Sequence, residues 1–147
     1  MISVRDQYEG AVLRHLARHS QYEKVIDLKD RHGHFRLNEK SYLLVKYSSS
    51  SVSPWRFTLR PDDLRTLVRD QNRAGLFGGS YVCLICGSRK VCVLNIDELG
   101  RILDLDGDSA QTIVVRHRPR SSLSVSGSDG RLKRKIPASR FPTLLFD

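Results

Sequence analysis

The fold of this chain is decided by residues 41–59, SYLLVKYSSSSVSPWRFTL, and the other elements can be placed around them. Residues 42–47 are apolar at both the odd and the even positions, except at Lys46. This pattern is typical of a strand covered on both faces. A run of four serines at residues 48–51 and the Pro54-Trp55 break separate these residues from residues 56–59, whose aromatic and β-branched content favours another strand. Pro61 suits the first position of a helix. We therefore expect a buried central strand that leads, through a short strand, into a helix.

Lys46 is the charged residue of the expected central strand. Its ammonium group must stay hydrated or paired, because burying it alone would cost several kcal/mol or force it to be neutral. Two interpretations stay open. Either the aliphatic stem covers apolar surface while the head reaches water, or the ammonium contacts a phosphate.

The segment before the central strand predicts a helix, a strand and a hairpin. Apolar residues recur at helical spacing first, and an alternation of polar and apolar residues follows. A hairpin that turns at Glu39 and Lys40 leads into the central strand and places Phe35 opposite Leu44. The expected elements are residues 4–18 for the helix, 22–28 for the strand and 34–38 for the first arm of the hairpin.

The segment after the central strand predicts two helices that flank a pair of interior strands. Asp62 and Asp63 favour the positive end of the first helix, and Gly75 ends it. Asn95 or Asp97 caps the second, shorter helix. The expected elements are a helix over residues 61–72, strands over 80–86 and 91–94 with a tight turn at 87–90, and a helix carrying Leu99, Ile102 and Leu103.

Length and composition predict one soluble α/β domain over residues 1–147, a mixed β-sheet flanked by helices. Hydrophobic residues make up 39%, and no apolar run approaches the roughly 20 residues of a membrane span. Asp6 and Glu9 stand where a secretory signal is apolar, and three cysteines fit a reducing compartment, so we expect a cytoplasmic protein. We divide the chain into a core, 1–95, and an extension, 96–147, with a helix and a basic β-hairpin.

The net charge of +9 is concentrated near the end of the chain, where residues 111–140 carry eight Lys and Arg against one Asp. Such asymmetry predicts a polyanionic partner, and nucleic acid is the commonest. A basic surface kept for solubility and an acidic protein partner are the alternatives. The expected nucleic-acid-binding residues are Lys46, Arg116, Arg118, Arg120, Arg131, Lys133, Arg134 and Lys135.

The basic residues are expected on a β-hairpin. Residues 123–126 and 132–136 read as strands, and Ser128-Asp129-Gly130 between them is a good turn. Alternation along a strand would place Arg131, Lys133 and Lys135 on one face, and Arg116, Arg118 and Arg120 on another. Such rows suit phosphates along a nucleic-acid strand.

The order of helix, strand, hairpin, strand, helix and strand over residues 8–94 resembles the core of the PD-(D/E)xK nuclease superfamily, which includes restriction endonucleases and Holliday-junction resolvases. Tyr8-Glu9 stands in the first helix, Leu44-Val45-Lys46 in the slot of the acidic-x-lysine motif, and TLRPDDL at 58–64 enters the next helix. The resemblance implies a restriction-endonuclease-like fold. In active members, an aspartate on the preceding strand and an acid two residues before the lysine hold Mg²⁺.

Both acidic positions of that motif are apolar here. The expected register places Phe35 and Leu44 in them, and neither side chain binds a metal. We therefore expect a non-catalytic protein without a metal or cofactor. The alternative is a Mg²⁺-dependent nuclease with migrated carboxylates, in which Glu9 and Asp27 or Asp30 would act with Lys46.

Two further features predict core packing. Cys83 and Cys86 would point to opposite faces of a strand, and no second ligand pair for zinc follows, so we expect small buried side chains. Trp55 beside Arg56 could stack on an unpaired base, but a lone tryptophan at the start of a strand favours packing.

Overall fold

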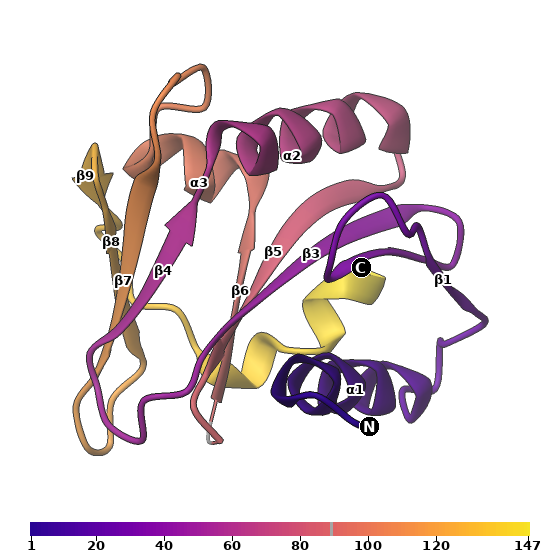
Figure 1. The fold of residues 1–147 in the computed structure, drawn as a ribbon, viewed down its shortest axis with the longest axis horizontal. Helices are drawn as coiled ribbons and strands as arrows, with labels where there is room; N and C mark the ends of the chain where they lie inside the picture. Colours follow the sequence, from indigo (N-terminus) through magenta and orange to yellow (C-terminus); the bar gives the residue numbers. More distant parts are fainter. Residues whose placement is uncertain (89) are drawn as a thin grey trace.

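The computed structural model describes residues 1–88 and 90–147, whose strands form two sheets (Figure 1). The first sheet is mixed, in the order β1-β2-β3-β5-β6, with β3 antiparallel to β2 and parallel to β5. The second sheet is antiparallel, in the order β4-β7-β8-β9. The α/β class with a mixed sheet is confirmed. The first sheet comprises β1 (Val25–Asp27), β2 (His34–Leu37), β3 (Ser41–Ser48), β5 (Gly79–Cys86) and β6 (Lys90–Asn95), and the second comprises β4 (Trp55–Leu59), β7 (Gln111–His117), β8 (Leu123–Gly127) and β9 (Gly130–Arg131).

The strand β3 is the central strand that its sequence predicts. Residues 41–45 are buried. Leu43 and Val45 belong to one hydrophobic cluster, whereas Leu44 belongs to the cluster on the opposite face of the sheet. The run is therefore apolar at both odd and even positions because both faces of β3 are covered.

The strand β4 belongs to the second sheet, and only one of its faces is covered. Trp55, Phe57 and Leu59 are buried, whereas Arg56 and Thr58 are exposed. This alternation is typical of an antiparallel sheet with one solvated face. The prediction of a single sheet is corrected here, since β4 leaves β3 after the serine run and pairs with β7.

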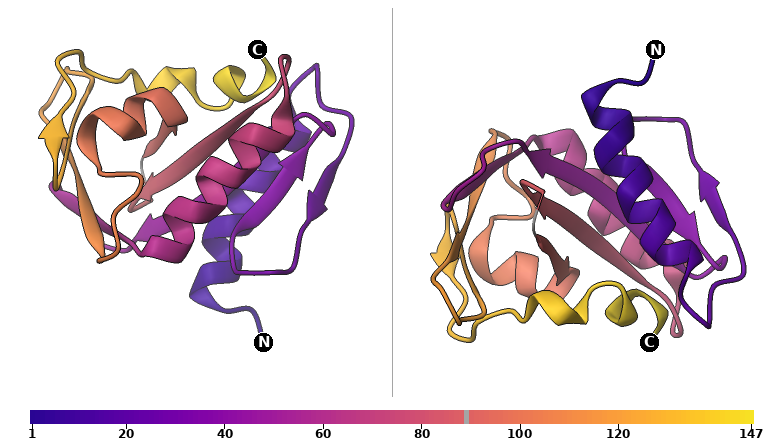
Figure 2. Two further views of the ribbon diagram at one scale, coloured as in Figure 1. Left: turned by 90° about the horizontal axis from the view of Figure 1, so that it is seen from above. Right: turned by 90° about the horizontal axis from the view of Figure 1, so that it is seen from below.

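Helices and turns cover both faces of the first sheet (Figure 2). One face packs on α1 (Val4–Ala17) and on the last turns of the chain, and the other packs on α2 (Pro61–Ala74), α3 (Ile96–Ile102) and the second sheet. The caps agree with the sequence, since Pro61 begins α2, Gly75 ends it and the Asn95 side chain caps α3. The last turns include the 3-10 helix η2 (Thr143–Phe146), whereas Ala138 of the preceding 3-10 helix η1 (Ala138–Arg140) packs against the cluster on the other face.

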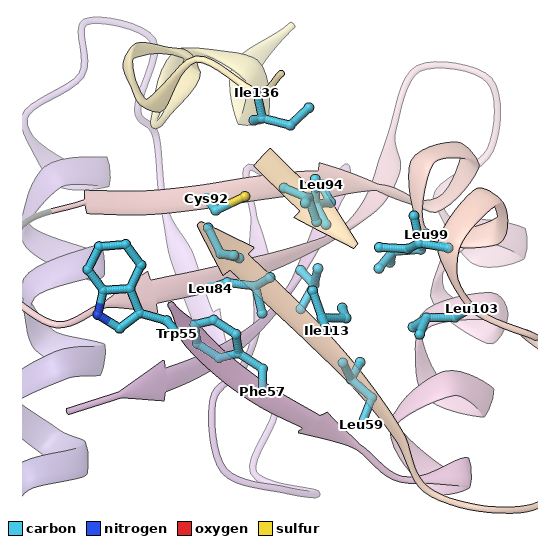
Figure 3. Close-up of a cluster of buried hydrophobic side chains, with 14 of the residues drawn as sticks. Trp55, Phe57, Leu59, Leu84, Cys92, Leu94, Leu99, Leu103, Ile113 and Ile136 are labelled. Atoms are coloured by element: carbon cyan, nitrogen blue, oxygen red, sulfur yellow. The ribbon is translucent and has the colours of Figure 1, made fainter. Parts of the chain in front are cut away.

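The larger hydrophobic cluster lies where the two sheets meet (Figure 3). Trp55 is buried at its end, and its Nε1 donates a hydrogen bond of 2.9 Å to Ser50 O, so the prediction of core packing is confirmed. Cys86 and Cys92 belong to this cluster, whereas Cys83 belongs to the cluster on the opposite face of the first sheet. All three thiols are free and buried. The cysteines act as small apolar side chains.

The hairpin that leads into β3 has a longer connection than its sequence predicts. Leu37 pairs with Ser41, so three residues, 38–40, form the connection instead of two. This extra residue shifts the register by one, and His34 lies opposite Leu44. The expected pairing of Phe35 with Leu44 is wrong, since Phe35 points into the cluster on the other face of the sheet.

The strand β6 lies at an edge of the first sheet, whereas its apolar sequence predicts an interior strand. Arg140 at the end of η1 covers this edge, because its Nε and Nη2 donate hydrogen bonds of 3.2 and 2.8 Å to Val93 O. The strand expected over residues 22–28 is reduced to β1. In the turn expected at 87–90, Arg89 lies outside the described residues.

Candidate functional site

The strand expected over residues 132–136 is instead a bulge. Leu132 N donates to Val125 O at 3.0 Å, and Ile136 pairs with Leu123, so three residues lie opposite Ser124 alone. The hairpin ladder of β8 and β9 is therefore short, and the bulged chain bends outward. We call residues 133–135 the basic bulge, since they are Lys133, Arg134 and Lys135.

The basic bulge borders a hollow of about 470 Å³ on the second sheet. Arg116 of β7 and Arg131 of β9 line the same hollow, together with Ser124 and Ser126 of β8. Among the described residues, none of the five cations around this hollow forms an ion pair with a carboxylate. These cations are Arg116, Arg131, Lys133, Arg134 and Lys135, and all are exposed.

An adjoining hollow of about 500 Å³ extends the basic surface toward α3. It shares Arg131 and two residues of the basic bulge, and Arg101 also lines it, paired at 3.5 Å with the exposed Asp97 carboxylate. Glu98 also lines it, but its carboxylate is taken by Arg140. The two hollows therefore present an excess of positive charge along one side of the second sheet.

Arg118 and Arg120 lie apart from these hollows. The strand β7 ends at His117, and both arginines stand exposed in the connection to β8, where Arg120 has a φ of 60°. The expected row of Arg116, Arg118 and Arg120 on one strand face is therefore wrong. Sequence alternation holds only while the strand continues.

Lys46 is paired inside the protein. Its Nζ lies 2.9 Å from Asp63 Oδ2, and Arg31 Nη1 lies 2.9 Å from Asp63 Oδ1. Asp63 Oδ2 also accepts a hydrogen bond of 2.9 Å from Arg60 N at the start of α2. The interpretation of Lys46 as a head that simply reaches water is corrected by this ion pair, although its side chain keeps 29% exposure.

The Asp63 carboxylate is held in its charged form. Burial disfavours this form, but the hydrogen bonds from Lys46 and Arg60 N and the charge of Arg31 outweigh burial and lower the pKa of Asp63. The sequence places Asp63 in the first turn of a helix, but not beside Lys46, because their contact depends on how α2 packs on β3.

A second polar network lies under α2 and was missed by the sequence reasoning. His34 Nδ1 lies 2.7 Å from Asp30 Oδ1, and its Nε2 lies 2.6 Å from the buried Asp70 Oδ2. Burial disfavours the imidazolium, but the hydrogen bonds and charges of Asp70 and Asp30 outweigh it and raise the pKa of His34. One signal was available, since Asp70 follows Leu67 by three residues and therefore lies on the buried stripe of α2.

The expected migrated ligands are only partly brought together. Glu9 and Lys46 line one cleft of about 380 Å³ with Arg5 and His32, whereas Asp27 is not part of its lining. Burial raises the pKa of Glu9 despite Arg5, whose Nε lies 4.0 Å from Glu9 Oε2. Within residues 1–88 and 90–147, no three His, Cys, Asp or Glu side chains gather closely enough to hold a metal ion.

The two positions to which the expected nuclease resemblance would assign acidic residues are Leu44 and, in the corrected register, His34. Leu44 is buried in the core, and both ring nitrogens of His34 are engaged by aspartates. Neither side chain therefore offers an oxygen to Mg²⁺.

Comparison with known proteins finds no family model, no curated protein and no solved structure that matches the chain. None of the described helices is long and apolar enough to span a membrane. The function is therefore inferred from the site itself.

Proposed function

We propose that this protein binds nucleic acid without cleaving it, and that the basic bulge and its neighbours contact the phosphates. The observation that carries the proposal is the hollow lined by five exposed cations that no described carboxylate neutralises. Binding of phosphates releases condensed counterions, so free Lys and Arg side chains give affinity without reading a sequence. Serine hydroxyls from Ser124 and Ser126 in the same hollow add hydrogen bonds to phosphate oxygens.

The proposed absence of cleavage rests on the residues in the acidic slots. Apart from β4, which joins the second sheet, the order is α1, β1, β2, β3, α2, β5, and this order, with β3 parallel to β5, supports a nuclease-like fold. Leu44 and His34 stand where such a fold would need carboxylates. The Asp63 carboxylate forms ion pairs with Lys46 and Arg31. Phosphate binding through Lys and Arg is independent of those acids, so it would survive their loss.

Binding is tested by fluorescence anisotropy with labelled duplex DNA, single-stranded DNA and RNA at about 50 mM salt, where phosphate contacts are strongest. The triple variant Lys133→Ala, Arg134→Ala, Lys135→Ala should bind duplex DNA more weakly. The slope of log K against log salt should become shallower by up to about 2.7, or about 0.9 for each lost phosphate contact.

A charge-matched control separates local contact from net charge. Arg14→Ala, Arg18→Ala and Arg73→Ala together remove three exposed positive charges from α1, its C-terminal end and α2, away from the second sheet. This control should keep the wild-type salt slope. If the wild-type protein binds none of the three nucleic acids, the proposal is wrong and the acidic protein partner takes its place.

A further inference from the structure

The second sheet has one face turned away from the core, and this outer face is polar and basic. Trp55, Phe57 and Leu59 point inward, as do Ile113, Val115 and Val125 on the neighbouring strands. The alternate residues therefore point outward. They are Arg56 and Thr58 on β4, Thr112, Val114 and Arg116 on β7, Ser124 and Ser126 on β8, and Arg131 on β9.

The four strands carry no acidic side chain on the outer face, although Arg56 and Thr58 at its β4 edge also line the cleft that contains Glu9 of α1. The three arginines of the outer face are exposed and form no ion pair among the described residues. Four of the other five outward residues are serines or threonines, and the fifth is Val114. The surface is therefore suited to phosphate and sugar oxygens.

Arg56 stands at the opposite edge of this face from the basic bulge. Backbone pairing places Arg56 beside Val114, Val114 beside Ser126, and Ser126 beside Arg131. The Cα atoms of Arg56 and Arg131 are thus three strand spacings apart, or about 14 Å. Because Arg56 precedes α2 and Arg131 lies near the end of the chain, only the pairing of β4 with β7 brings both onto one face.

The chemistry of the face favours a duplex over an unpaired strand. Proteins that hold single strands stack the bases on aromatic side chains, worth about 1–3 kcal/mol per base. The outer face offers none, since Trp55 and Phe57 point into the core. Arginines about 14 Å apart instead match phosphates on the two sides of a groove, since the major groove of B-DNA is about 12 Å wide.

We propose that the ligand is a nucleic-acid duplex that lies across the outer face of the second sheet, with Arg56 contacting one backbone and Arg131 and the basic bulge contacting the other. This inference rests on the proposed function and names its ligand and a further contact residue. Val114 and Ser126 lie between the two backbones and face the groove.

Arg56→Ala tests the inference, because the exposed Arg56 side chain makes no hydrogen bond among the described residues and its loss leaves the core intact. Duplex affinity at about 50 mM salt should fall about fivefold, the equivalent of one exposed ion pair. The salt slope should become shallower by about 1. Arg56→Lys keeps the charge and should keep the slope, and Arg73→Ala on α2 is the matched control with no expected effect.

A duplex and a single strand with equal numbers of phosphates are compared in the same assay. The duplex should bind more tightly. Equal or tighter binding of the single strand, or identical behaviour of Arg56→Ala and Arg73→Ala, overturns the inference. If the triple variant of the basic bulge still weakens binding in that case, the proposed function stands and only the duplex model fails. If no nucleic acid binds, both fail.

Discussion

Lys46 Nζ and Asp63 Oδ2 lie 2.9 Å apart, and this contact joins the central strand to the first turn of α2. The same oxygen of Asp63 accepts the hydrogen bond from Arg60 N that starts the helix. One carboxylate therefore caps α2 and fixes it against β3. Lys46, the residue that resembles a catalytic lysine, is part of a structural contact.

Removal of either partner should lower the free energy of unfolding. Lys46→Met should cost about 1–2 kcal/mol, because Asp63 keeps Arg31 as a counterion. Asp63→Ala should cost more, about 2–4 kcal/mol, because it leaves two cations and a helix amide without their acceptor. Urea unfolding of the single and double variants measures both values, and additive costs would contradict the pairing.

An exposed ion pair supplies the control for that experiment. Lys24 Nζ lies 2.6 Å from Glu39 Oε1, with both side chains at least half exposed. Lys24→Met should therefore cost less than about 1 kcal/mol.

The contribution of His34 to the stability of the protein should fall as the pH rises above the unfolded pKa of about 6.5. The pKa of His34 is raised in the folded protein, so its charged form is favoured by folding. This contribution is complete below the unfolded value of about 6.5 and is lost as the pH rises through the folded pKa. Urea unfolding at a series of pH values should show this loss.

His34→Asn isolates the effect, because the other four histidines remain in the variant. The difference in unfolding free energy between wild type and variant should shrink across the same pH interval. A direct NMR titration of His34 in the folded wild type gives its pKa without a variant. A value at or below about 6.5 would show that Asp30 and Asp70 do not hold the charged form.

Incubation with Mg²⁺ or Mn²⁺ should not lead to cleavage of DNA or RNA. Metal-assisted hydrolysis needs carboxylate oxygens about 2.0–2.2 Å from the ion, and Leu44 and His34 stand at the positions where the proposed nuclease-like fold would need these carboxylates. Gel assays with the purified protein at a low molar excess over the nucleic acid measure cleavage. Cleavage abolished by Lys46→Ala and by Glu9→Ala or Asp27→Ala would identify migrated ligands and reject the non-catalytic proposal.

The three cysteines should react with thiol reagents only after unfolding. Burial raises the pKa of Cys83 and of Cys86 to about 12, so little thiolate is present at neutral pH. A dithionitrobenzoate assay with and without urea measures accessibility. Fast reaction of the native protein would contradict the buried arrangement.

Zinc should not co-purify with the protein in stoichiometric amount, because Cys83 and Cys86 point into different clusters. One zinc per chain, lost in Cys83→Ser or Cys86→Ser, would contradict this arrangement.

The sequence by itself determined the secondary elements of the core and the place of the central strand. The apolar run of β3, the alternation in β4 and the caps at Pro61 and Asn95 are local signals, because each depends on side-chain periodicity or on backbone chemistry within a few residues. The concentration of positive charge in residues 111–140 is also visible in the sequence.

Only the tertiary structure decided the contacts between distant segments. One extra residue in the 38–40 connection replaced Phe35 by His34 opposite Leu44, and a bulge broke the expected strand of the basic hairpin. The pairing of β4 with β7 placed Arg56 on the same face as Arg131. Register, bulges and the packing of α2 on β3 are set by the fit between surfaces far apart in the chain, and local periodicity carries no information about that fit.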